Sequence, residues 1–82
     1  PKLTIGFAAE TNDLVKNSLK KLEEKNCDWI VANDVSDSSI GFDSEDNEVS
    51  IFYKNNTRET LKKMSKSLIA KELVNRVIDK LN

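Results

Sequence analysis

Two lysines on one predicted helix, Lys21 and Lys25, have the type and spacing that best fit a chemical role. On a helix with about 100° per residue they lie one turn apart, at the edge of the apolar stripe. Two cations at this spacing repel each other modestly. A nearby polyanion would attract both, because a lysine ammonium is a good point-charge partner for phosphate. Spacing alone favours the plainer interpretation, a solvated helix flank with lysine stems lying along it.

A second group of polar residues follows the apolar run 29–31, which stops at Ala32, Asn33 and Asp34. Asn33 and Asp34 either line a ligand site or form an Asx turn, and the local sequence favours the turn. A long segment rich in Asp, Ser and Gly then separates this run from the next apolar one. We interpret this polar excursion as the border of a ligand crevice.

Residue counts exclude several kinds of site built from this chain alone. The sequence has no histidine and one cysteine, Cys27, which excludes Cys–His and Ser–His nucleophilic sites and the common His-containing zinc sites. Cys27 lies beside an apolar run and is predicted to be a small buried hydrophobe. The two glycines are too few for a glycine-rich phosphate loop. Residues 43–47 resemble the start of a calcium loop, but Glu48 and Lys54 occupy its glycine and closing glutamate positions, so no metal site is expected.

Length and charge limit the class of protein. Eighty-two residues form at most one small domain. A chain of this size buries only about 60% of its unfolded surface, so its core is marginal unless a partner completes it. Thirteen basic and 14 acidic residues argue weakly against nucleic-acid binding. No apolar run approaches the roughly 20 residues of a membrane helix and no signal peptide is present, so a cytoplasmic location is expected. Because the chain starts at Pro1 without Met, further upstream residues are expected.

Hydrophobic patterns predict a strand, a helix and a second strand as the elements that position these residues. Residues 2–9 mix β-branched and aromatic side chains over a strand length. Residues 28–33 form the continuous apolar run typical of a strand covered on both faces. Between them, residues 13–25 show helical spacing, with Asp13 at the start and Asn26 after the end.

The second half of the chain contains an ambiguous segment. Residues 48–53 predict a third strand with one face wet, and Asn55-Asn56 predicts a turn. Residues 57–64 either extend the last helix toward its N-terminus, with Glu59 in a capping box, or form the return arm of a hairpin. The final helix carries an apolar stripe of Ile69, Leu73, Val77 and Leu81, widened by Ala70 and Ile78.

The strand–helix–strand order predicts two parallel neighbours joined by a right-handed crossover. The segments around Phe7 and Asn33 then reach the carboxyl ends of adjacent strands, which is the edge of an open α/β sheet where ligands bind. The residue pattern alone therefore predicts part of an α/β nucleotide-type domain.

Three motifs in this order resemble a known family: GFAAET at 6–11, KNCDWIVANDV at 25–35 and GFDSEDNEV at 41–49. Together they resemble phosphopantothenoylcysteine synthetase, more specifically the C-terminal portion of the bacterial enzyme, which is often fused to a flavin-dependent decarboxylase. The resemblance implies a Rossmann-like three-layer α/β fold with parallel strands, a crossover helix, a β-hairpin and a C-terminal helix. It also favours the hairpin for residues 57–64, with Ser65 capping the final helix.

The resemblance implies an activity and its substrates. The family joins 4′-phosphopantothenate to cysteine in coenzyme A biosynthesis and works as a homodimer. The bacterial form consumes CTP: the carboxylate attacks the α-phosphate, giving an acyl-cytidylate and pyrophosphate with Mg²⁺ present, and the cysteine amine then displaces CMP. Residues 1–82 would be the C-terminal segment of this ligase domain, and FMN would be needed only by a decarboxylase fused upstream.

Carried over residue by residue, the family's CTP contacts match Phe7, Lys21 and Lys25. Phe7 would pack beside the nucleotide, and the two lysines would reach its phosphates. Glu23 and Glu24 stand where the family is commonly basic, but both point away from the lysine edge on a helical wheel.

No catalytic residue is carried over. The family's glycine-rich start, its pantothenate-closing asparagine and its catalytic lysine motif lie upstream, so this polypeptide alone is not expected to catalyse the ligation. The sequence leaves CTP versus ATP open. The rival interpretation is a non-catalytic α/β binding or assembly module, or one half of a split enzyme, and a generic flavin or dinucleotide binder is a distant third.

Overall fold

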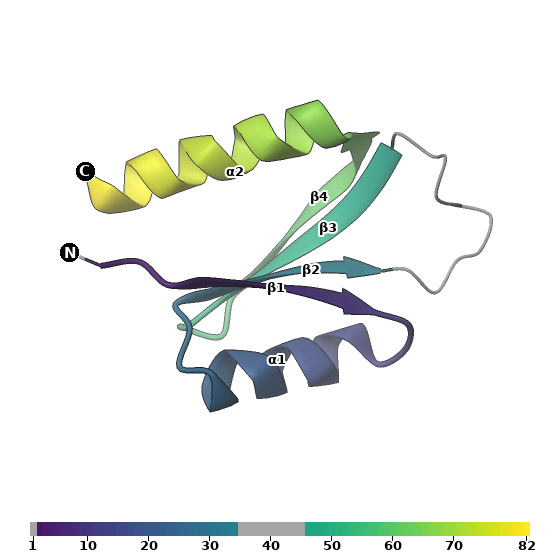
Figure 1. The fold of residues 1–82 in the computed structure, drawn as a ribbon, viewed down its shortest axis with the longest axis vertical. Coiled ribbons are helices and arrows are strands. Elements are labelled where there is room, and N and C mark those ends of the chain that lie inside the picture. The colour runs from purple at the N-terminus through teal and green to yellow at the C-terminus, as the bar shows by residue number, and fades with distance from the viewer. Residues whose placement is uncertain (1, 35–45) are drawn as a thin grey trace.

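A computed structural model describes residues 2–34 and 46–82 of the protein, apart from the side chains of residues 34, 46 and 47. The elements follow the predicted order, with a hairpin between the third strand and the last helix (Figure 1). They are β1 (Ile5–Glu10), α1 (Leu14–Glu24), β2 (Trp29–Asp34), β3 (Asp46–Tyr53), β4 (Arg58–Ser65) and α2 (Lys66–Leu81). The expected roles of residues 35–45 lie outside the described part of the chain.

The four strands form one mixed sheet in the order β1-β2-β3-β4. β1 and β2 are parallel, with Phe7 beside Val31 and Glu10 beside Asp34 in register. β2 pairs antiparallel with β3, and β3 pairs antiparallel with β4. The predicted parallel pair and the predicted hairpin are therefore both confirmed.

The two helices lie on opposite faces of the sheet and give the fold three layers (Figure 1). α1 packs mainly against β1 and β2, whereas α2 packs against β3 and β4. Each helix therefore covers only half of its own face. On the α2 face, the half formed by β1 and β2 has no helix over it within the described residues.

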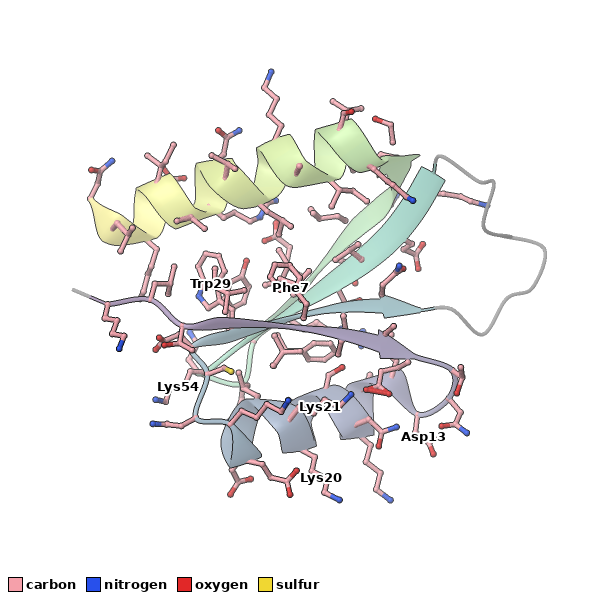
Figure 2. All side chains as sticks on the ribbon, viewed as in Figure 1. Phe7, Asp13, Lys20, Lys21, Trp29 and Lys54 are labelled. Atoms are coloured by element: carbon pink, nitrogen blue, oxygen red, sulfur yellow. The ribbon has the colours of Figure 1, made fainter. Side chains whose placement is uncertain are left out.

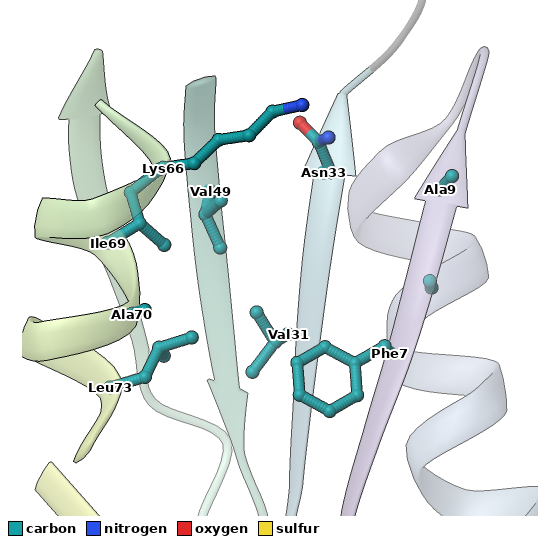
Figure 3. Close-up of a pocket in the computed structure, with 10 residues that line it drawn as sticks. Phe7, Ala9, Val31, Asn33, Val49, Lys66, Ile69, Ala70 and Leu73 are labelled. Carbon is teal, nitrogen blue, oxygen red and sulfur yellow. The ribbon is translucent and has the colours of Figure 1, made fainter. Parts of the chain in front are cut away.

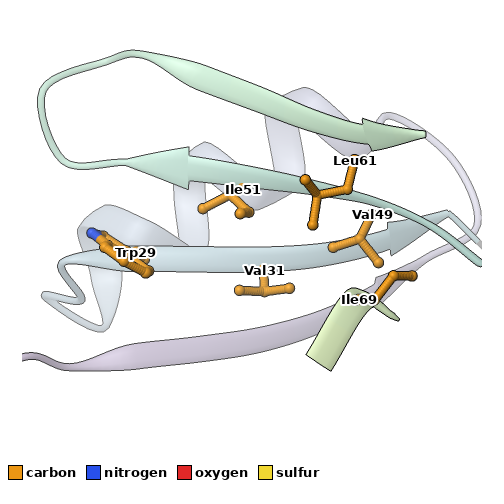
Figure 4. Packing of buried hydrophobic residues seen from close by; sticks show 6 residues of the cluster. All are labelled: Trp29, Val31, Val49, Ile51, Leu61 and Ile69. Atoms are coloured by element: carbon orange, nitrogen blue, oxygen red, sulfur yellow. The ribbon is translucent and has the colours of Figure 1, made fainter. Parts of the chain in front are cut away.

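The core consists of one apolar cluster on each face of the sheet. The cluster beneath α2 comprises Trp29, Val31, Val49, Ile51, Leu61 and Ile69 (Figure 4). The cluster beneath α1 comprises Leu22, Cys27, Ile30, Ala32 and Phe52. Alternate residues of β2 enter both clusters, because successive side chains of a strand point to opposite faces. This confirms that the second strand is covered on both sides and that Cys27 is buried.

The ends of the two helices and the β3–β4 turn lie where the local sequence predicted them. Asn26, just after α1, and Asn56, in the β3–β4 turn, have φ angles of 50° and 67°, a left-handed conformation that Asn tolerates. Asp13 takes the N-cap position of α1 with φ 45° and no side-chain cap bond. Ser65 caps α2, because its Oγ accepts a hydrogen bond of 3.2 Å from the Leu68 amide.

The first strand begins later than the pattern predicts, at Ile5 rather than at residue 2. The backbone just before it bonds to Asp28, in the turn that precedes β2, and to Trp29, the first residue of β2. Thr4 donates its N–H to Asp28 Oδ2 at 2.9 Å, and its carbonyl accepts from the amides of Asp28 and Trp29. These three bonds hold the start of β1 against the start of β2.

The apolar stripe of α2 is buried only in its first half. Ile69 is buried, and Leu73 and Val77 pack against the same cluster, whereas Ile78 and Leu81 are about half exposed. The predicted widening of the stripe toward Ile78 therefore does not correspond to burial within the described residues. Neither helix in this part of the chain has the length and apolar character needed to cross a bilayer.

Candidate functional site

Phe7 and Asn33 line the same pocket, which lies on the α2 face of the sheet. Phe7 belongs to β1 and Asn33 to β2, the two strands whose carboxyl ends adjoin at Glu10 and Asp34. The predicted shared edge of two parallel strands is therefore confirmed. The pocket is open and has a volume of about 660 Å³, within the usual range for small-molecule sites.

The pocket is mostly apolar. Helix α2 packs over β3 and β4, so within the described residues it leaves apolar side chains of β1 and β2 uncovered on the same face. One wall is the β1–β2 surface, where Phe7 is 73% exposed, and the other wall is the first half of α2 (Figure 3). The lining residues are Phe7, Ala8, Ala9, Val31, Asn33, Val49, Lys66, Ile69, Ala70 and Leu73. An exposed aromatic ring beside such a surface can stack on a planar ligand group.

Lys21 and Lys25 do not line this pocket. Lys21 belongs to α1, on the opposite side of the sheet from Phe7 (Figure 2). Lys21 is in the last turn of α1 and Lys25 is its exposed C-cap residue. β1, the edge strand of the described sheet, lies between Phe7 on one face and α1 on the other. The structure thus brings Phe7 and Asn33 together and separates them from the lysine pair.

Lys21 is held by a residue that the sequence pattern did not single out. Its Nζ lies 2.6 Å from Glu10 Oε1, and the Glu10 side chain is only 10% exposed. The contact follows from strand alternation, since Glu10 points to the α1 face at the end of β1. A carboxylate this buried requires a charged partner. Glu10 therefore both orients the Lys21 ammonium and offsets its charge.

A second charged group ties β4 to α2 away from the pocket. The Arg76 guanidinium donates from Nε and Nη2 to the two Glu59 carboxylate oxygens, at 2.8 and 2.7 Å, and contacts Glu72 at 3.1 Å. Tyr53 donates to Glu59 Oε1 at 2.7 Å. Hydrogen bonds from Arg76 and Tyr53 lower the pKa of Glu59 from 4.5 to about 2. Burial, reinforced by Glu59, raises the pKa of Tyr53 to about 12. We interpret this group as structural.

The described residues offer no cluster of three or more His, Cys, Asp or Glu side chains able to hold a metal ion. Residues 35–45 and the side chains of Asp34, Asp46 and Asn47 lie outside the described part, so the role of Asp34 in a site and the polar segment as the border of a crevice stay predictions. Lys66 is the pocket residue that sequence reasoning missed. Lys66 precedes the apolar stripe of α2, so the helical spacing of that stripe did not point to it.

A three-layer α/β fold with an open pocket at the carboxyl edge of a parallel strand pair belongs to the Rossmann-like class of folds, in which ligands commonly bind at this edge. A comparison with protein families identifies the member of this class. The chain belongs to the family described as DNA/pantothenate metabolism flavoprotein C-terminal domain, which matches residues 1–81.

Curated relatives and a solved structure agree with this assignment. The chain is 41% identical over 76 residues to the coenzyme A biosynthesis bifunctional protein CoaBC of Bacillus subtilis, covering 93% of this chain and 19% of that protein. It is 42% identical over 77 residues to the CoaBC protein of Haemophilus influenzae, covering 94% of this chain and 19% of that protein. This chain thus spans about a fifth of the length of these relatives.

The fold is also that of a crystal structure described as the C-terminal domain of the bifunctional protein CoaBC. The TM-score is 0.78 at 34% identity, with 98% of this chain and 38% of that chain covered. The similarity therefore extends through all six elements of the chain.

Proposed function

We propose that residues 1–82 are the C-terminal part of a CTP-dependent ligase that joins 4′-phosphopantothenate and cysteine in coenzyme A biosynthesis. The observation that carries the proposal is the pocket shared by Phe7 and Asn33 at the edge of two parallel strands, in a chain of this family. The rest of the ligase domain is its partner in the same protein, which works as a cytoplasmic homodimer and is fused to a decarboxylase that uses FMN. No described residue is assigned to FMN.

In this proposal, the chain binds and orients the nucleotide but supplies no catalytic residue. Phe7 packs beside the nucleotide, in keeping with its exposed ring at the pocket wall. Lys21 and Lys25 bind CTP phosphates, for which their charge is suited. The phosphopantothenate carboxylate attacks the α-phosphate of the bound nucleotide, which gives an acyl-cytidylate and releases pyrophosphate. The cysteine amine then attacks the acyl carbon and displaces CMP.

The positions of the three residues constrain how CTP lies. Phe7 lies on the α2 face of β1, whereas Lys21 lies on α1, on the other side of the sheet (Figure 2), and Lys25 follows at the C-cap of the same helix. We therefore propose that the nucleotide passes over β1, the edge strand of the described sheet, with one end near Phe7 and its phosphates toward α1. We propose that Mg²⁺ enters with the triphosphate, since this ion is commonly bound through substrate phosphates.

The test is Phe7→Ala in the full-length enzyme. Loss of the ring removes a stacking surface worth about 1–3 kcal/mol, so we expect the KM for CTP to rise roughly tenfold while the KM for cysteine is unchanged. Leu68→Ala is the matched control, because Leu68 is an exposed apolar residue outside the pocket. An effect confined to the KM for cysteine, or equal effects of both substitutions, would contradict the proposal and favour a non-catalytic binding module.

A further inference from the structure

The geometry points to Lys66 as a further binding residue of this pocket, where it takes an anionic group of the substrate, a phosphate or a carboxylate. This inference rests on the proposed function, because it treats the pocket of Phe7 and Asn33 as the ligand site.

Lys66 is the only charged residue among those that line the pocket in the described part of the chain. It is the first residue of α2, and its side chain extends across the open end of the pocket toward Asn33 (Figure 3). Below this end, the walls consist of aliphatic and aromatic side chains, among them Val31, Val49 and Leu73. Mostly apolar pockets use a few polar groups to fix the orientation of a ligand. Lys66 and Asn33 are the two residues with polar side chains among those that line the pocket in the described part of the chain.

The position of Lys66 on its helix is unfavourable without an anion. The N-terminus of a helix carries partial positive charge and favours acidic residues in the first turn. The first turn of α2 contains no acidic residue and begins with this lysine. The described residues show no ion pair of Lys66, and proteins break local rules of this kind mainly at functional sites. A bound anion would offset both the ammonium and the partial charge of the helix end.

The plainer alternative is a lysine whose stem covers Val49 and Ile69 while its ammonium stays in water. The two interpretations predict different kinetics. A covering stem contributes through its methylene groups, so a charge-free side chain of similar length should replace it fully. A substrate contact requires the charge, and its loss should affect one anionic substrate and not the others.

The experiment compares Lys66→Met and Lys66→Arg in the full-length enzyme, with KM and kcat measured separately for CTP, 4′-phosphopantothenate and cysteine. We expect Lys66→Met to raise the KM for CTP or for phosphopantothenate about tenfold, the size of a lost charge-assisted hydrogen bond, and Lys66→Arg to restore most of it. The substrate whose KM changes identifies the source of the anion. Lys71→Met is the matched control, because Lys71 is exposed on the same helix and does not line the pocket.

The outcomes separate the inference from the proposed function. If Phe7→Ala raises the KM for CTP and Lys66→Met changes none, the inference is wrong and the proposed function stands. If neither substitution has an effect, both are wrong. If Lys66→Met acts while Phe7→Ala does not, the anion contact holds and the role of Phe7 is wrong. Equal changes in Lys66→Met and Lys71→Met, or equal losses in Met and Arg variants at position 66, also overturn the inference. Thermal unfolding of each variant checks that the fold is intact.

Discussion

Lys21 Nζ lies 2.6 Å from Glu10 Oε1, and this ion pair joins the last turn of α1 to the end of β1. The Glu10 side chain is 10% exposed and that of Lys21 is 38% exposed, so the carboxylate is the partner that depends on the pair. Removing a lysine that is proposed to bind phosphate therefore also leaves a buried charge uncompensated. Binding and stability effects at this position must be separated.

A double-mutant cycle on this pair makes the separation. We expect Lys21→Met in the full-length protein to lower the free energy of unfolding by about 1–2 kcal/mol, less than for a fully buried pair because Lys21 is partly exposed. Adding Glu10→Gln should recover most of the loss, since the neutral amide needs no counter-charge. Thermal unfolding of the four proteins measures it. A double variant no more stable than Lys21→Met alone would show that Glu10 does not depend on this partner.

Lys25 offers a cleaner test of phosphate binding, because it is exposed at the C-cap of α1. We expect Lys25→Ala to raise the KM for CTP about two- to fivefold, the size of an exposed charge interaction, and this increase should shrink at high salt. Steady-state kinetics at two ionic strengths measure it. Lys20→Ala is the control, because Lys20 is also exposed on α1 but is not assigned to the nucleotide. The same increase in both variants would contradict a specific contact.

Arg76 and Glu59 predict a loss of stability in acid. The pKa of Glu59 is lowered from 4.5 to about 2, so its carboxylate stabilises the fold above about pH 4.5, and this stability is lost as the pH falls toward 2. Since the Glu59 side chain is 41% exposed, we expect a contribution of only about 1 kcal/mol. Thermal unfolding of the wild type and of Glu59→Gln between pH 5 and pH 3 measures it. Parallel pH dependence in the two proteins would exclude this role for Glu59.

Gly6 is predicted to be required by close packing between β1 and its neighbours. A Cβ at this position would lie 2.8 Å from Ile30 Cδ1 and 3.2 Å from Cys27 Sγ. We expect Gly6→Ala to destabilise the protein by about 1–3 kcal/mol, as overpacking does. Ile30→Val removes the nearer atom, so the double variant should lose less stability than the sum of the two single ones. Additive losses in thermal unfolding would show that this contact is not the cause.

Several elements could be predicted from the sequence because their signals are local. The helical spacing over residues 13–25, the turn at Asn55-Asn56 and the Ser65 cap depend on neighbours within a few positions, and the structure confirms them. Residues 57–64 had two local solutions. In the structure these residues pair with β3 and form the hairpin. Glu59 therefore binds Arg76 instead of capping a helix.

The sequence by itself determined the order of the elements, the parallel strand pair and the meeting of Phe7 with Asn33 at one edge. Only the tertiary structure decided that the lysine pair lies on the opposite face, that Glu10 holds Lys21, and that Lys66 reaches the pocket. The physical reason is that periodicity shows which side of an element is apolar. The face of the sheet that an element covers, and how far it extends over that face, depend on packing between residues far apart in the chain.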